Sequence, residues 1–184
     1  MSDFDVLSSK YAGRWIVITG IRDLDYPIAR GIVVHKMTEV VQGRPLGIVF
    51  GGARGVDTLA LRAAWLARGG ADAMMITPKL VAVVPDSVDR QPRTAAHTIR
   101  DCADEVIELH LPIYRAGSFH KRNEHMLLLA RERSDGLPQA PLCIGFTDNV
   151  DPRSGGTAST MSLARRLVIE VEHVPTPRVQ GGAD

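Results

Sequence analysis

The stretch VFGGARGVDTLALRAAW, residues 49–65, joins the end of an apolar strand to a glycine-rich turn and the start of a helix. The turn contains Gly51, Gly52, Arg54 and Gly55, and Asp57 follows it. Glycine lets a backbone approach a ligand closely and adopt positive φ angles. A helix that begins at such a turn offers unpaired N–H groups and the positive end of its dipole. The stretch therefore favours a site for phosphate or another anion.

The same succession of apolar run, turn and helical segment recurs along the chain. Runs that are apolar throughout are typical of strands buried on both faces of a parallel sheet. Strands that alternate with helices are joined by right-handed crossovers. We predict strands over 14–20, 46–52, 80–86, 104–112, 141–149 and 167–175, and helices over 27–42, 57–69, 92–102, 118–134 and 156–167. The predicted fold class is α/β, a Rossmann-like open, mostly parallel sheet with helices on both faces.

Length and composition narrow the class of protein. With 184 residues, 45% of them hydrophobic, the chain suits one domain over 1–184, with a core of about 14–175 and short flexible tails. A net charge of +1 does not require nucleic acid or an anionic membrane, so any basic site must be local. Cys102 and Cys143 lie outside any CxxC spacing, which favours a reducing compartment. Without a signal sequence or a long apolar run, we expect a cytoplasmic protein with no membrane partner.

Polar and glycine residues gather where the predicted strands end. Ligands of open α/β sheets bind at this edge, near the point where the strand order reverses. Besides the turn at 51–57, the candidates are Gly20, Arg22 and Asp23 after the first strand, Asp148 after the fifth, and Gly155, Gly156 and Thr157 in the turn that follows. Asp57 and Thr157 are each placed to cap the helix behind their turn. The alternatives are an Arg22–Asp23 salt bridge, and an Asx turn at Asp148.

The stretch HKRNEHM, residues 120–126, is expected to begin a helix near the same edge. The guanidinium of Arg122 can hold a phosphate or carboxylate through two hydrogen bonds, and Asn123 follows it. The alternative is a solvated basic helix end. His120 and His125 do not share a helix face, and no cysteine or carboxylate pair stands at ligand spacing. We therefore predict no metal and no cofactor.

Arginines also occur at 90, 93 and 100, but no aromatic residue lies between them. Bases of single-stranded nucleic acid stack on aromatic side chains, so this segment does not favour such a ligand. Trp15 and Trp65 are expected in the core or in subunit contacts.

Four motifs, in order, resemble those of the SLOG superfamily, in its YspA/YpsA-related branch. The stretch GGARGVDTLALRAAW resembles the GGARGxDxxA motif, and VITGIRD is similar to the opening strand of that branch. AGSFHKRNEHML resembles the AGxxRNxxM segment, and SGGTASTMSLARR resembles the closing GGT-helix. The resemblance covers roughly residues 14–175. The superfamily includes the DNA-processing protein A family, which binds single-stranded DNA, the lonely-guy phosphoribohydrolases, and modules that sense nucleotide signals.

We predict that the chain binds a nucleotide or nucleotide-derived ligand as a sensor or carrier module. The phosphate would lie on the turns at 51–55 and 155–157, held by Arg54 and Arg122, while Asp57 caps its helix or orders Arg54. Arg22 and Asp23 would contact the sugar or base. We expect a homo-oligomer.

Two other functions stay open. The first is cleavage of the N-glycosidic bond of nucleoside monophosphates, with Arg122 and Asp57 as candidate catalytic residues and Asp148 or Glu124 as other carboxylates. The lonely-guy enzymes, as the resemblance implies, carry a glutamate three residues after the threonine of their PGGxGTxxE motif, where this chain has Thr160. The second is binding of single-stranded DNA, expected to be weak because the charge is near neutral and aromatic residues are scarce.

Overall fold

The apolar runs form one parallel sheet in a computed structural model, which describes residues 9–22, 24, 26–69, 78–112, 116–148, 151 and 155–177. The six strands stand in the order β4-β3-β2-β1-β5-β6. Every neighbouring pair is parallel. The strands are β1 (Trp15–Gly20), β2 (Gly47–Phe50), β3 (Lys79–Val84), β4 (Glu105–Glu108), β5 (Leu142–Thr147) and β6 (Glu170–Pro175). The predicted α/β fold class is confirmed.

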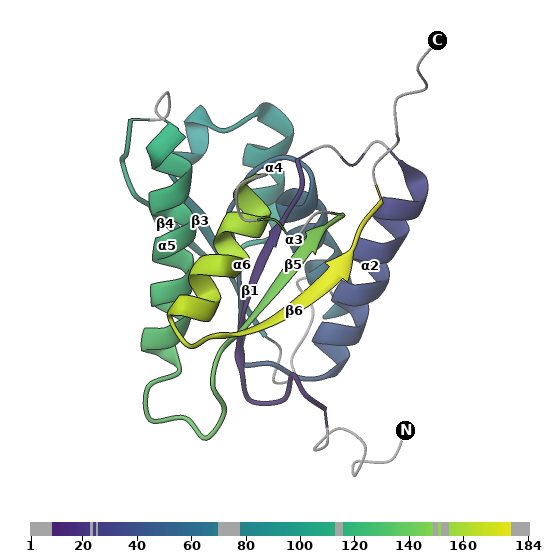
Figure 1. Ribbon diagram of the computed structural model, residues 1–184. Helices are drawn as coiled ribbons and strands as arrows, with labels where there is room; N and C mark the ends of the chain where they lie inside the picture. Colours follow the sequence, from purple (N-terminus) through teal and green to yellow (C-terminus); the bar gives the residue numbers. More distant parts are fainter. Residues whose placement is uncertain are drawn as a thin grey trace.

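Helices cover both faces of the sheet (Figure 1). The helices are α2 (Pro27–Gln42), α3 (Val56–Ala67), α4 (Arg93–Cys102), α5 (Ala116–Arg133) and α6 (Gly156–Arg166), with a short 3-10 helix, η2 (Val88–Arg90). Buried side chains of α2, α3 and α4 share one hydrophobic cluster, and those of α5 and α6 share another. The sheet separates the two clusters because successive strand residues point to opposite faces. Ile16 and Ile18 of β1 belong to the first cluster, and Val17 belongs to the second.

Burial differs between the centre and the edges of the sheet. Strands β2 and β5 are buried at every residue, and β1 and β3 at all but one. The edge strand β4 alternates half-buried and exposed residues and is four residues long. The predicted strand over 104–112 is therefore too long, because only its start pairs with β3. Trp15 lies in the core, as expected.

The order of the strands reverses between β1 and β5. From β1 the chain continues outward through β2, β3 and β4, and then returns to β5 and β6 on the other side of β1. Loops that leave the carboxyl ends of β1 and β5 therefore diverge, which is the arrangement that opens a ligand crevice in such sheets. The predicted flexible tails are 1–9 and 178–184, and all of their residues except Ser9 lie outside the described residues.

Candidate functional site

The sequence candidates meet at the carboxyl edge of the sheet. The backbone after β1 contacts both neighbouring segments, because Ile21 N–H donates to Phe146 O of β5 (3.1 Å) and Ile21 O accepts from Val56 N–H of α3 (3.0 Å). Helix α5 reaches the same place from the other face of the sheet through Arg122, which contacts the turn after β2. Segments far apart in the sequence therefore build one site.

A buried ion pair lies at the centre of this site. Nη1 of Arg122 donates to Gly51 O and lies 3.4 Å from Oδ2 of Asp57. Both residues are 5% exposed. Oδ2 of Asp57 also accepts the N–H of Ala53, at 3.3 Å. One carboxylate thus holds the glycine-rich turn against a guanidinium from a helix on the opposite face of the sheet.

The predicted cap is wrong at this helix. The N-cap position of α3 is Gly55, which makes no side-chain cap, and Asp57 lies inside the first turn. Its side chain accepts the Ala53 N–H of the turn and lies beside the guanidinium of Arg122. Asp57 therefore stabilises the turn rather than the end of its own helix.

Burial sets the ionisation of the pair. It raises the pKa of the Asp57 carboxyl above its ordinary value, while the Arg122 guanidinium, the Ala53 N–H and the charge of Arg22 oppose the rise. Burial lowers the pKa of Arg122. The negative charge of Asp57 raises this pKa, and the positive charge of Arg22 lowers it further. An arginine keeps its proton because its ordinary pKa lies above about 12. Nε of Arg122 is buried and has no hydrogen-bond partner among the described residues, so it remains an unused donor.

The glycines of the first turn are required by packing. A Cβ on Gly51 would overlap the guanidinium of Arg122 and the carboxylate of Asp57. Gly55 has φ +87°, and a Cβ there would overlap the carbonyls of Ile21 and Arg22. The N–H of Val56, at the start of α3, is bonded to Ile21 O. This turn is therefore filled by neighbouring protein atoms.

The second glycine turn, before α6, is open. Gly155 and Gly156 are exposed, and a Cβ on either would meet nothing within 4 Å. Gly155 takes the N-cap position without a side-chain cap, so the predicted cap by Thr157, which is buried in the helix, is wrong. The open backbone of Gly155 and Gly156 has the space that an approaching anion requires.

Asn123 positions the start of α6. Its Nδ2 donates to Oγ1 of Thr160 (2.6 Å), and Thr160 Oγ1 donates to Gly156 O (2.7 Å). Asn123 is 7% exposed, so it is built into the contact between α5 and α6. Thr160 occupies the position where the resemblance implies a glutamate in the lonely-guy enzymes. It is buried, and its hydroxyl takes part in both of these hydrogen bonds. Asp148, after β5, is exposed at the same edge of the sheet.

An aromatic contact at the site was missed from the sequence. The guanidinium of Arg22 lies 4.4 Å from the centroid of the Phe119 ring, while Arg22 itself is exposed. Phe119 belongs to α5 and is far from Arg22 in the sequence, so no local sequence pattern indicates this contact. Asp23, the predicted partner of Arg22, lies outside the described residues, and Arg54 is exposed. Gly20 is in close contact with α3, because a Cβ there would overlap Val56.

In the other basic segment, two of the three arginines pair with acids. Arg90 contacts Asp86 at 3.0 Å, and Arg100 contacts Asp89. In the described part of the chain, no group of three or more His, Cys, Asp or Glu is arranged to hold a metal ion. The helices among those residues include none that is both long and apolar enough to cross a membrane.

Comparison with protein-family models and with curated protein sequences gave no match. Among solved structures, the chain resembles DNA processing protein A from Helicobacter pylori, in a study of its single-stranded DNA binding mode. The TM-score is 0.62 and the identity 20%, over 97% of this chain and 71% of that one. At 20% identity this likeness bears on the fold alone. The chain therefore has the Rossmann-like fold of DNA processing protein A.

Proposed function

We propose that this chain binds a nucleotide or nucleotide-derived ligand at the carboxyl edge of the sheet, as a sensor or carrier module. The observation that carries the proposal is that two guanidinium groups, of the exposed Arg22 and the buried Arg122, act on one buried carboxylate, Asp57. The positive charges of Arg22 and Arg122 both attract the Asp57 carboxylate, and the two guanidinium groups repel each other. A phosphate beside these guanidinium groups would relieve their mutual repulsion.

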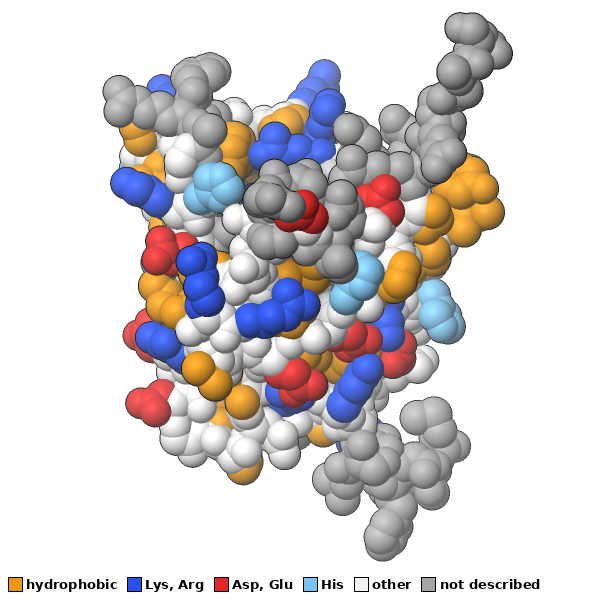
Figure 2. Space-filling model, in the orientation of Figure 1, with side chains coloured by type: hydrophobic (Ala, Val, Ile, Leu, Met, Phe, Trp, Pro, Cys, Tyr) orange, Lys and Arg blue, Asp and Glu red, His pale blue; other side chains and the backbone are white. Residues whose placement is uncertain are grey.

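The arginines divide into two kinds. Arg22 and Arg54 are exposed and are the groups that meet the ligand, whereas Arg122 is buried and supports the turn that carries Arg54. Nε of Arg122 supplies a further donor for a ligand that reaches into the crevice. The open backbone at Gly155 and Gly156 supports a phosphate position at the start of α6. Figure 2 shows Lys and Arg side chains at the top of the molecule, the end where the strands of Figure 1 finish, as well as lower on the same face.

A thermal-shift panel tests the proposal. Nucleoside monophosphates, ADP-ribose and dinucleotides should include one that raises the melting temperature, since a ligand at about 100 times its Kd adds roughly 2.7 kcal/mol. Arg22→Ala and Arg54→Ala should lose the shift and keep the melting temperature of the free protein. Arg62→Ala is the matched control, because Arg62 is an exposed arginine of α3 near Cys102 of α4. A flat panel with folded protein would refute the proposal.

Binding of single-stranded DNA is the second candidate, favoured by two observations. The structural neighbour is a protein studied for its single-stranded DNA binding mode, and the Arg22–Phe119 contact puts an aromatic ring beside an exposed guanidinium at this edge. Affinity for a single strand falls with salt with a slope of about −0.7 for each contacted phosphate. Tight, steeply salt-dependent binding of an oligonucleotide, without stabilisation by any mononucleotide, would replace the first proposal by this one.

A further inference from the structure

A guanidinium plane lies against an aromatic ring at the carboxyl edge of the sheet. The guanidinium carbon of Arg22 lies over the Phe119 ring, 4.4 Å from its centroid. Phe119 is half-buried on α5, whereas Arg22 is exposed in the segment after β1. Arg22 and Phe119 therefore form a stacked pair, in which the ring covers one face of the guanidinium and the opposite face is turned away from the ring.

The backbone on each side of the stacked pair is packed against neighbouring atoms. Ser118, which precedes Phe119, is 4% exposed, and its hydroxyl donates to Pro112 O. On the other side, a Cβ on Gly55 would overlap the carbonyl of Arg22. A ligand that uses a pair held in this way loses less binding free energy to the ordering of side chains and loops.

The stacked pair lies close to the groups proposed to hold a phosphate. The positive charge of Arg22 acts on Asp57 and on Arg122, so its guanidinium lies within electrostatic range of the glycine-rich turn. Stacking occupies the face of a guanidinium and leaves its N–H edge for an anion. A ligand that joins a planar base to a phosphate through one sugar therefore meets both kinds of group at this end of the sheet.

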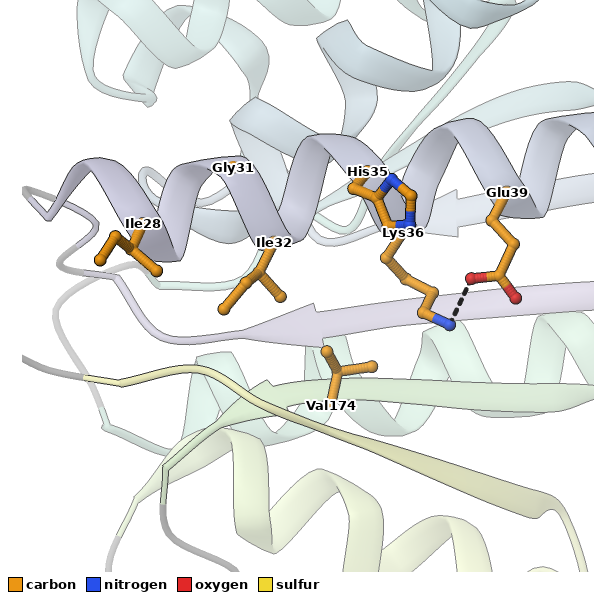
Figure 3. A pocket seen from close by; sticks show the side chains of 7 residues that line it. All are labelled: Ile28, Gly31, Ile32, His35, Lys36, Glu39 and Val174. Atoms are coloured by element: carbon orange, nitrogen blue, oxygen red, sulfur yellow. Dashed lines mark hydrogen bonds and ion pairs between the residues drawn. The ribbon is translucent and has the colours of Figure 1, made fainter.

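The pocket between α2 and β6 does not offer this combination (Figure 3). Ile28, Ile32 and Val174 give it apolar walls. Its Lys36 contacts Glu39 at 2.6 Å, and among the described residues no Phe, Tyr, Trp or Arg lines it. A base with an attached phosphate would therefore gain more at the stacked pair than in this pocket.

We propose, on the basis of the function proposed above, that the ligand is a purine nucleotide whose base stacks on the face of the Arg22 guanidinium that is turned away from Phe119. Nucleobases stack on planar guanidinium groups, and one stacked base changes affinity by about tenfold or more. A purine has two fused rings and covers more of the guanidinium plane than the single ring of a pyrimidine. A sugar phosphate has no base and gains nothing from the stacked pair.

Calorimetric titration with AMP, GMP, ADP-ribose, CMP and ribose 5-phosphate tests the ligand class. Wild type should bind at least one of the purine nucleotides about tenfold more tightly than CMP and ribose 5-phosphate. Arg22→Lys keeps the charge and removes the plane, while Phe119→Leu keeps an apolar side chain and removes the ring. Both variants should lose most of the preference. Phe119→Tyr, which keeps the ring, and the control Arg62→Lys, at an exposed arginine of α3, should retain it.

The outcomes of the titration separate the base position from the function. A purine preference that survives in both Arg22→Lys and Phe119→Leu would overturn the stacking and leave nucleotide binding intact. Binding of CMP or ribose 5-phosphate as tightly as any purine nucleotide would do the same. If none of the nucleotides binds, the proposed function fails, and the base position fails with it.

The Nε–H resonance of Arg22 provides a signature that a merely structural role would not produce. In isotopically labelled protein, this signal is identified by its absence from the spectrum of Arg22→Lys. A purine stacked on the guanidinium shields the proton, so saturation with the tightest purine nucleotide should move the signal upfield, whereas ribose 5-phosphate should not. No upfield shift with that nucleotide bound, or an equal shift with ribose 5-phosphate, would overturn the proposal.

Discussion

Removing the guanidinium of Arg122 should cost far more stability than removing a surface arginine. In Arg122→Met, the Asp57 carboxylate stays buried and keeps the Ala53 N–H as its described partner. Breaking one side of a buried ion pair typically costs about 3–5 kcal/mol. Urea denaturation, with an unchanged m value, measures the loss. Arg54→Ala serves as control because Arg54 is exposed, and it should change the free energy of unfolding by less than about 0.5 kcal/mol.

The double variant identifies the cause. Asp57→Asn in the Arg122→Met background removes the buried charge but keeps an oxygen that can accept the Ala53 N–H, so part of the lost stability should return. Asp57→Asn alone should cost less than Arg122→Met alone, because it leaves an arginine bonded to Gly51 O. A cost of less than about 1 kcal/mol for Arg122→Met, a value usual for solvated pairs, would refute the buried-pair interpretation.

The pH dependence of the same variants has a definite sign. The pKa of Asp57 is raised in the folded protein, so the folded state holds more protons than the unfolded state above the ordinary pKa of about 4. Stability from this group is therefore present below that pH and is lost as the pH rises towards the folded pKa. Without Arg122 the rise in pKa is larger, so the difference in stability between wild type and Arg122→Met should shrink as the pH is lowered towards 4. A difference that is independent of pH would contradict this account.

Three further predictions concern other parts of the structure. Val168, a β-branched residue with φ +60° that is 88% exposed after α6, should gain about 1 kcal/mol in chemical denaturation when changed to Gly; an unchanged or lower stability would contradict it. Gly51→Ala should lower the melting temperature sharply because its Cβ overlaps Arg122, whereas Gly156→Ala should leave it nearly unchanged, and equal effects would show that the first turn is not packed as described. Incubation with each nucleoside monophosphate should release little or no ribose 5-phosphate. The resemblance to the lonely-guy enzymes implies that Thr160 stands where they carry a glutamate, and a hydroxyl cannot stabilise positive charge on the sugar as a carboxylate does. Turnover abolished by Asp57→Asn would make the protein a hydrolase.

Much of the fold could be predicted from the sequence because local pattern encodes it. The central strands are apolar at nearly every residue, and this pattern also located the helices between them. The edge strand β4 was overextended, because an apolar run does not show where pairing with a neighbour ends.

The site was predicted in outline and not in its contacts. The strand ends gave the right edge of the sheet, but the cap predictions failed because glycines hold both N-cap positions. The contact between Arg122 and Asp57 joins residues 65 positions apart, and Phe119 reaches Arg22 from another element. Such contacts depend on how α5 packs across the sheet, which local periodicity does not specify.

The contact of Arg122 with Gly51 also limits how this chain can be divided. The two residues are 71 positions apart, yet the glycine leaves the space that the guanidinium fills. A fragment that stops before α5 would contain the complete glycine-rich turn and α3, but it would leave Asp57 beside an unfilled hole. The same turn grafted onto another strand and helix would lack its arginine in the same way. The glycine-rich motif is thus a structural unit only together with α5.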